Sequence, residues 1–213
     1  MNKVTTLFLS AALLLNSPMK AQNDAPQTLL DKTVSRLEKD GGITMNLKVV
    51  VRNGMGTDTR EVTFDMSGNS FRSTDDENTI WFDGKTLWRG SDFGSGIEEI
   101  YISEPLPDEA SRFNLVGMLK EHEGFNVEVN GQDSFTLKAS ETGGGMAGIN
   151  AITVKVAPST GIPLSATVLF SEETGDIKAD ITVTGYTPGQ KFNTETFICP
   201  VKKYKDADII DLR

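Results

Sequence analysis

The sequence predicts a mainly β protein with helices, an α+β fold built on one large, curled antiparallel sheet. Short runs of alternating apolar and polar residues follow one another along most of the chain. Turn residues such as Asn53-Gly54 and Asp83-Gly84 separate many of these runs. Strands and helices do not alternate regularly, as they would in a parallel sheet, so an antiparallel sheet is favoured.

The first residues are predicted to form a signal peptide. Lys3 supplies a positive charge before the apolar run 4–15, which is too short to cross a bilayer comfortably. Cleavage is expected after Ala21, which removes residues 1–21 and leaves a single domain over residues 22–213. No cysteine follows the cleavage site to carry a lipid anchor, so we expect an exported protein that is free in the periplasm. A buried N-terminal helix is the alternative, and the polar, proline-containing segment 23–26 disfavours it.

The chain is acidic and carries one cysteine. Its formal charge is −9, and removal of residues 1–21 takes away two lysines and no acids, which gives −11. Phosphate backbones and anionic lipid headgroups repel such a protein, so nucleic-acid and membrane-surface binding are disfavoured. Because Cys199 has no second cysteine to pair with, stability must come from burial and sheet pairing. We interpret Cys199 itself as a small buried hydrophobic residue.

Two segments have the spacing of amphipathic helices. In residues 27–40, Leu30, Val34 and Leu37 fall on one face, and Gly41-Gly42 ends the pattern. A second helix is predicted over residues 109–120, where the apolar face includes Phe113, Val116 and Leu119. Two helices are too few to cover one face of a wide sheet. Curling, loops or a bound ligand must cover the rest.

Strand patterns occupy most of the remaining chain. Residues 43–51 alternate as a long half-buried strand, and Val62, Phe64 and Met66 continue the pattern after a turn. Asp206, Asp208 and Asp211 near the end are interpreted as a solvated acidic tail. The later strands are predicted at residues 97–102, 125–129, 135–139, 149–156, 164–170, 177–186 and 192–197.

The hairpin around Asp83-Gly84 carries the only two tryptophans of the chain, Trp81 and Trp88. Large aromatic rings on a β-ribbon must be covered by a core or by a ligand. Alternation allows only one of Trp81 and Phe82 to face inward, and likewise only one of Leu87 and Trp88. The sequence does not determine which.

The chain resembles the periplasmic outer-membrane lipoprotein carrier family, LolA. The resemblance rests on the hairpin Trp81-Phe82-Asp83-Gly84-Lys85-Thr86-Leu87-Trp88, on an N-terminal helix followed by long strands, and on the tail 197–213. In that tail a phenylalanine-bearing strand, a proline-and-lysine turn and a terminal Ile-Ile-Asp pattern follow one another.

This resemblance implies an incomplete β-barrel with lid helices over an apolar cavity. It implies a monomeric chaperone without a cofactor, which carries lipoproteins non-covalently by their acyl chains from the inner to the outer membrane. The implied partners are outer-membrane lipoproteins, an inner-membrane lipoprotein-release complex and an outer-membrane receptor. The candidate lipid-binding residues of the cavity wall are Met45, Leu47, Val49, Val62, Phe64, Phe71, Trp81, Phe82 and Trp88. Those of the lid are Leu30, Val34, Phe113, Val116 and Leu119.

One position departs from the family pattern. Where well-known members carry an arginine associated with holding the lid shut, this chain has Ser67, and Arg72 is only a loose substitute. The mechanism of the lid latch and the identity of the outer-membrane acceptor are therefore not predicted.

Other interpretations remain open. Each candidate wall residue could belong to an ordinary core. A lipid-binding regulatory or sensor module of the envelope could use the same half-barrel. An enzyme acting on envelope lipids or glycans would need a nucleophile or an acid/base pair, and the strand pattern displays none.

His122, the only histidine, has no nearby histidine or cysteine with which to bind a metal. We therefore predict no catalytic residue and no metal ligand.

Overall fold

The fold comes from a computed structural model, which describes residues 25–105, 119–120, 124–140, 149–170 and 177–213. The predicted signal peptide, His122 and most of the predicted second helix, with Phe113 and Val116, lie outside these residues. No described helix is long and apolar enough to cross a membrane. In chain order the described helix and strands are α1 (Ala25–Asp40), β1 (Gly42–Asn53), β2 (Gly56–Ser67), β3 (Ser70–Thr74), β4 (Asn78–Phe82), β5 (Leu87–Asp92), β6 (Ile97–Ser103), β7 (Phe125–Val129), β8 (Ser134–Ala139), β9 (Ile149–Val156), β10 (Pro163–Phe170), β11 (Lys178–Gln190) and β12 (Asp208–Asp211).

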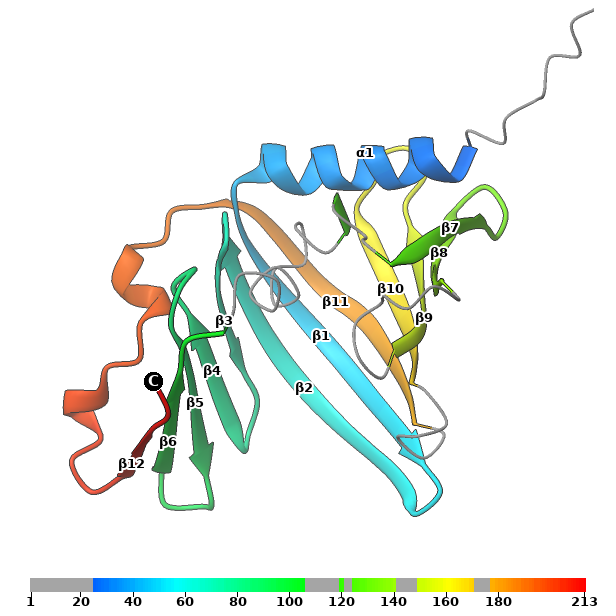
Figure 1. Ribbon diagram of the computed structural model, residues 1–213. Helices are drawn as coiled ribbons and strands as arrows, with labels where there is room; N and C mark the ends of the chain where they lie inside the picture. Colours follow the sequence, from blue (N-terminus) through cyan, green and yellow to red (C-terminus); the bar gives the residue numbers. More distant parts are fainter. Residues whose placement is uncertain (1–24, 106–118, 121–123, 141–148, 171–176) are drawn as a thin grey trace, which may run out of the picture.

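The described strands form one sheet of twelve, in the order β12-β6-β5-β4-β3-β2-β1-β11-β10-β9-β8-β7. Strands β1 to β6 form one antiparallel meander and β7 to β11 form a second. The two meanders join where β1 pairs antiparallel with β11, and β12 adds to β6 in the parallel direction. Figure 1 shows α1 lying across one end of this sheet, above β1, β10 and β11. The prediction of one large, mainly antiparallel sheet is confirmed.

The register assigns side chains to two faces of the sheet. Met45 of β1 lies opposite Phe64 of β2 and Tyr186 of β11, and Leu47 lies opposite Val62. Residues directly opposite each other point to the same side of a sheet. We call the side that carries these residues the inner face and the opposite side the outer face.

The main core forms between α1 and the inner face. Leu30, Val34 and Leu37 of α1 are buried there, as the helical spacing predicted. Their cluster contains fully buried residues from both meanders, which ties the two halves of the sheet together. Its buried strand members are Ile43, Met45, Met66, Phe71, Phe82, Phe125, Phe135, Leu137, Ile152, Val154 and Val156.

Polar contacts fix the carboxyl end of α1 to the sheet. The Asp40 carboxylate, with a side chain only 8% exposed, accepts a hydrogen bond from Arg36 Nε at 2.7 Å. The Tyr186 hydroxyl of β11 donates to the same Asp40 oxygen, also at 2.7 Å. A carboxylate at a helix C-terminus is normally unfavourable because the helix dipole is negative there. Here the two donors offset that cost, and the bond from Tyr186 holds the last turn of α1 on β11.

The C-terminal region differs from the prediction in two places. The segment 192–197, predicted as a strand, contains a 3-10 helix at Thr194–Phe197. Asn193 caps this helix, because its side chain accepts a hydrogen bond from the Glu195 backbone N–H. The acidic tail, predicted to be solvated, forms β12, whose backbone pairs with the edge of β6. The alternation of apolar residues predicted a strand at 192–197 because it carries no information about the Asn193 cap. The acidic side chains of the tail predicted exposure to solvent because they carry no information about the free edge of β6, with which the backbone of β12 pairs.

The C-terminal segment covers the outer face of β4 to β6. Trp81, Trp88, Ile100 and Ile102 form a second buried cluster with Cys199, and Val201, Tyr204 and Ala207 pack against it. The rings of Trp81 and Tyr204 lie 6.3 Å apart. Trp81 and Trp88 therefore face outward, while Phe82 and Leu87 belong to the inner cluster. The structure thus decides the orientation that alternation left open.

Gly161 provides a test of how closely α1 approaches the sheet. Its φ is +75°, and a Cβ built on it would lie 2.9 Å from the Lys32 backbone oxygen of α1. Gly189 has nearly the same φ, +73°, but open space around it. We expect Gly161→Ala to lower the free energy of unfolding by about 1 kcal/mol more than Gly189→Ala. Both alanines are strained by the positive φ, but only the Cβ at position 161 clashes with the backbone of α1. Urea unfolding measures this difference. Equal losses would contradict the close approach.

Burial of Cys199 predicts an unreactive thiol. Its environment raises its pKa to about 12, because burial disfavours the thiolate. We expect a thiol reagent at pH 8 to label native protein no faster than the protein opens, and to label urea-unfolded protein at the rate of a free cysteine. The comparison needs no variant, because Cys199 is the only cysteine in the chain. Rapid labelling of the native protein would show that the C-terminal segment does not cover the outer cluster.

Candidate functional site: the apolar inner face and an adjoining polar groove

The inner face is apolar across both halves of the sheet. One row runs from Val51 of β1 through Ala179, Val168 and Ile152 to Leu137 of β8, each residue opposite the next. The outer face of the same strands is polar, since Lys48, Thr182 and Ser165 lie opposite one another there. This half of the sheet is therefore amphipathic, with one side suited to water and the other to hydrocarbon.

Cover over the inner face decreases along β1 and β2. Met45, close to α1, is 3% exposed, whereas Leu47 and Val49 are only partly buried. On β2, Phe64 and Val62 show the same partial burial. The apolar face thus continues past the fully buried cluster, as a half-buried hydrocarbon surface.

Most predicted lipid-binding residues lie together on this face. The phenyl rings of Phe64 and Phe71 stack with centroids 5.4 Å apart, and the ring of Phe82 follows 5.6 Å from that of Phe71. Two predicted wall residues, Trp81 and Trp88, lie apart from this group on the outer face, beneath the C-terminal segment. The predicted residues on the inner side, counting the lid, are Leu30, Val34, Met45, Leu47, Val49, Val62, Phe64, Phe71, Phe82 and Leu119.

Arg72 does not point toward α1. It lies on the outer face, where its Nη2 binds Asp65 Oδ2 at 2.7 Å. The buried Asp65 also accepts a hydrogen bond from Thr44 Oγ1 at 2.6 Å. Arg72 is thus committed to a polar network on the side of the sheet opposite α1. Polar contacts near the end of α1 include those of Asp40 with Arg36 and Tyr186 and the ion pair of Glu38 with Lys120.

A polar groove lies on the inner face of β2 to β6, beyond the apolar cluster. Its volume is about 910 Å³. Successive inward positions change from apolar to polar along β4, where Ile80 is followed toward the strand start by Asn78. The residues that line the groove are Arg60, Asp76, Glu77, Asn78, Arg89, Ser91, Asp92, Phe93, Gly94, Glu99 and Tyr101.

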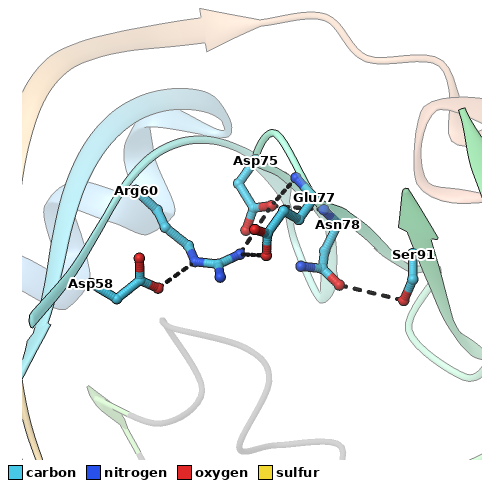
Figure 2. A network of polar contacts seen from close by, with 6 residues as sticks. All are labelled: Asp58, Arg60, Asp75, Glu77, Asn78 and Ser91. Carbon is cyan, nitrogen blue, oxygen red and sulfur yellow. Dashed lines mark hydrogen bonds and ion pairs between the residues drawn. The ribbon is translucent and has the colours of Figure 1, made fainter. Parts of the chain in front are cut away.

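An ion-pair network forms one wall of the groove. Figure 2 shows Arg60 between Asp58 and Glu77. The nitrogen–oxygen distances from Arg60 are 2.8 Å to Asp58, 2.6 Å to Glu77 and 3.7 Å to Asp75. Hydrogen bonds to Asp58 and then Glu77 raise the pKa of the Arg60 guanidinium. No pattern in the sequence predicted this groove. The sequence feature that could have revealed the groove is the presence of polar residues at some inward-facing strand positions, in strands whose other inward-facing residues are apolar.

Comparison with solved structures identifies a protein that shares the fold of this chain. No family model matches the chain, and no curated protein does. An uncharacterized conserved protein from Thermus thermophilus matches with a TM-score of 0.52 and 13% identity, over 87% of this chain and 98% of that one. At this identity the match shows a shared fold and leaves function open.

Two further solved structures match less well. A LolA superfamily protein from Nitrosomonas europaea matches with a TM-score of 0.43 and 10% identity, over 82% of this chain and 97% of that one. The structure of a Pseudomonas aeruginosa MucA/MucB complex matches with a TM-score of 0.38 and 13% identity, over 82% of this chain and 62% of that one. Both scores are lower than the first, and neither establishes a shared function.

The Tyr186–Asp40 contact predicts a pH dependence of stability. Burial, followed by the hydrogen bond to Asp40, raises the pKa of Tyr186 above its ordinary value of 10.0. A raised pKa favours the protonated hydroxyl in the folded state. The stabilisation is therefore complete below pH 10.0 and is lost as the pH rises above it toward the folded-state value.

We expect Tyr186→Phe to lower the free energy of unfolding at pH 7 by about 1–2 kcal/mol, because the Asp40 carboxylate loses a donor. Above pH 10 the variant should lose stability less steeply than the natural chain. Urea unfolding at several pH values measures both effects. Tyr101→Phe, at a tyrosine 38% exposed on β6, is the control. Parallel pH profiles for the natural chain and Tyr186→Phe would contradict the assignment.

Proposed function

We propose that this protein is a periplasmic chaperone that binds the acyl chains of lipoproteins and carries them from the inner to the outer membrane. It makes no covalent change in its cargo. The observation that supports the proposal is the inner face itself. This face is apolar across both meanders, is buried beneath α1 and continues as a half-buried surface along β1 and β2. The resemblance of the sequence to the lipoprotein carrier family supports the same function.

Hydrocarbon burial supplies the affinity. Each buried methylene group contributes about 0.8 kcal/mol, so an acyl chain needs only part of its length on the face to be held. Met45 and Met66 lie among the phenylalanine and aliphatic side chains, and flexible thioethers adapt to chains of different shape. In this proposal α1 is a lid, and Leu30 and Val34 exchange their contacts with the sheet for contacts with the cargo.

The proposed partners follow from the route. Outer-membrane lipoproteins are the cargo, an inner-membrane release complex loads it, and an outer-membrane receptor takes it over. The predicted signal peptide supports a periplasmic location in this proposal. The negative charge keeps the carrier away from anionic headgroups between loading and delivery.

Leu47→Glu tests the inner face as the acyl-binding surface. Leu47 is half-buried beside the apolar cluster, so a carboxylate there would have to be desolvated by a bound acyl chain. We expect the affinity for a triacylated lipoprotein to fall by more than tenfold. We expect the free energy of unfolding to fall by about 1 kcal/mol or less, because the site is not fully buried. Native mass spectrometry of residues 22–213 with released lipoprotein measures binding, and urea unfolding measures stability.

Val50→Glu is the matched control. Val50 is also half-buried and lies on β1, but it points to the outer face opposite Asp180 and Thr59. It should leave lipoprotein binding unchanged. Equal loss of binding in both variants, or no binding by the natural chain, would overturn the proposal. Binding of diacyl phospholipid without any transfer of lipoprotein between membranes would point instead to the lipid-binding sensor.

A further inference from the structure

Among the described residues that line it, the polar groove has an excess of negative charge. Its lining contains four carboxylates, of Asp76, Glu77, Asp92 and Glu99, and two guanidinium groups, of Arg60 and Arg89. Arg60 and Glu77 pair with each other. In the part of the chain that the structure describes, none of the remaining four charges forms an ion pair. Three carboxylates thus face one guanidinium in the groove, a balance that favours a cationic occupant.

Two exposed aromatic residues border the same groove. Phe93, at the turn between β5 and β6, is 67% exposed, and Tyr101 of β6 is 38% exposed. Rings left open to water beside a concave surface are typical of sites that bind a peptide, since they supply contact area at little cost in conformational entropy. The aliphatic stems of lysine and arginine pack well on such rings, and their charged heads can then reach the carboxylates. Aromatic and acidic groups together favour a basic peptide over a small cation.

The groove adjoins the apolar face directly. Ile80 packs against the apolar cluster, and Asn78, two residues away on the same face of β4, lines the groove. Two residues along a strand span only about 7 Å. A molecule with its acyl chains on the apolar face would therefore have its next covalently attached segment at the groove.

We propose that this groove binds a basic, extended peptide segment of the cargo, the segment that immediately follows its acylated end. The proposal rests on the acyl-binding function proposed above and adds to it a preference for the peptide part of the cargo. Asp76, Asp92 and Glu99 pair with lysine or arginine side chains, and Phe93 and Tyr101 pack on their stems. Cargo with an acidic segment at the same place is repelled.

Two lipopeptides with the same acylated cysteine test the proposal. One continues with a serine and a run of lysines and the other with a serine and a run of glutamates, so their acyl chains contribute equally. We expect the natural chain to bind the lysine lipopeptide about tenfold more tightly at low ionic strength, with the ratio falling toward one as salt screens the groove. Competition against a fluorescent fatty acid, below the critical micelle concentration of each lipopeptide, measures both affinities.

Variants of the groove carboxylates test whether the preference for the lysine lipopeptide arises in the groove. Glu99→Gln removes one groove charge and keeps the side-chain shape, and Asp76→Asn/Glu99→Gln removes two. We expect the preference for lysine to fall roughly threefold in the single variant and nearly to vanish in the double variant. Glu61→Gln makes the same change in net charge on the outer face, where Glu61 lies opposite Lys48, and should leave the preference intact.

The outcomes separate the two proposals. If neither lipopeptide binds, the acyl-binding function fails, and this proposal fails with it. Equal binding of both lipopeptides keeps the acyl-binding function and overturns the role of the groove. A preference that Glu61→Gln reduces as much as Glu99→Gln shows long-range attraction by net charge, which also overturns the groove as the peptide site.

Discussion

Strand alternation is the constraint on which the rest of this structure depends. Because apolar side chains recur at alternate positions along much of the twelve-stranded sheet, one face is largely apolar and its exposure to water is unfavourable, so α1 packs there. Strands β4 to β6 break the rule by being apolar on the outer face as well, at Trp81, Trp88 and Ile100. That second apolar surface requires a second cover, and residues 199–207 provide it. The C-terminal segment and the helix thus both shield apolar side chains from water, on opposite sides of the sheet.

The proposed binding surface and the hydrophobic core are one continuous set of residues. A fully buried leucine or phenylalanine contributes about 1.5–3 kcal/mol, so lifting α1 without a replacement would be costly. An acyl chain is such a replacement, because it returns apolar contacts to the side chains that α1 leaves. The directional contacts of α1 lie at a few points, among them Asp40 with Tyr186 and Lys32 with the Pro158 carbonyl. A lid held by contacts of this kind can exchange its apolar partners and keep a defined closed position.

Periodicity was enough to predict the helix, most strands and the single large sheet. It predicted which residues of a strand share a face, but it did not predict which of the two faces packs against α1. Alternation states that Trp81 and Phe82 point in opposite directions, but which of them meets α1 depends on where the C-terminal segment folds back. The 3-10 helix after Asn193 was missed because one cap hydrogen bond outweighed a weak strand pattern. The groove was missed because Arg60, Asn78, Ser91 and Glu99 come together only through the register of five strands, which no local pattern encodes.

The pairing of β1 with β11 has a consequence for how the chain reaches this structure. Each meander pairs strands that are neighbours in sequence, whereas the ion pair between Arg52 and Asp180 across the β1–β11 seam joins residues 128 apart. Closing so long a loop is entropically costly, so the seam should form after the two meanders. Helix α1 leads into β1 yet packs on β7 and β8 in the other half, so it can dock only once the seam has closed. A newly synthesised chain therefore keeps its apolar face open to water until the last stage of folding, and during that interval aggregation competes with completion of the fold.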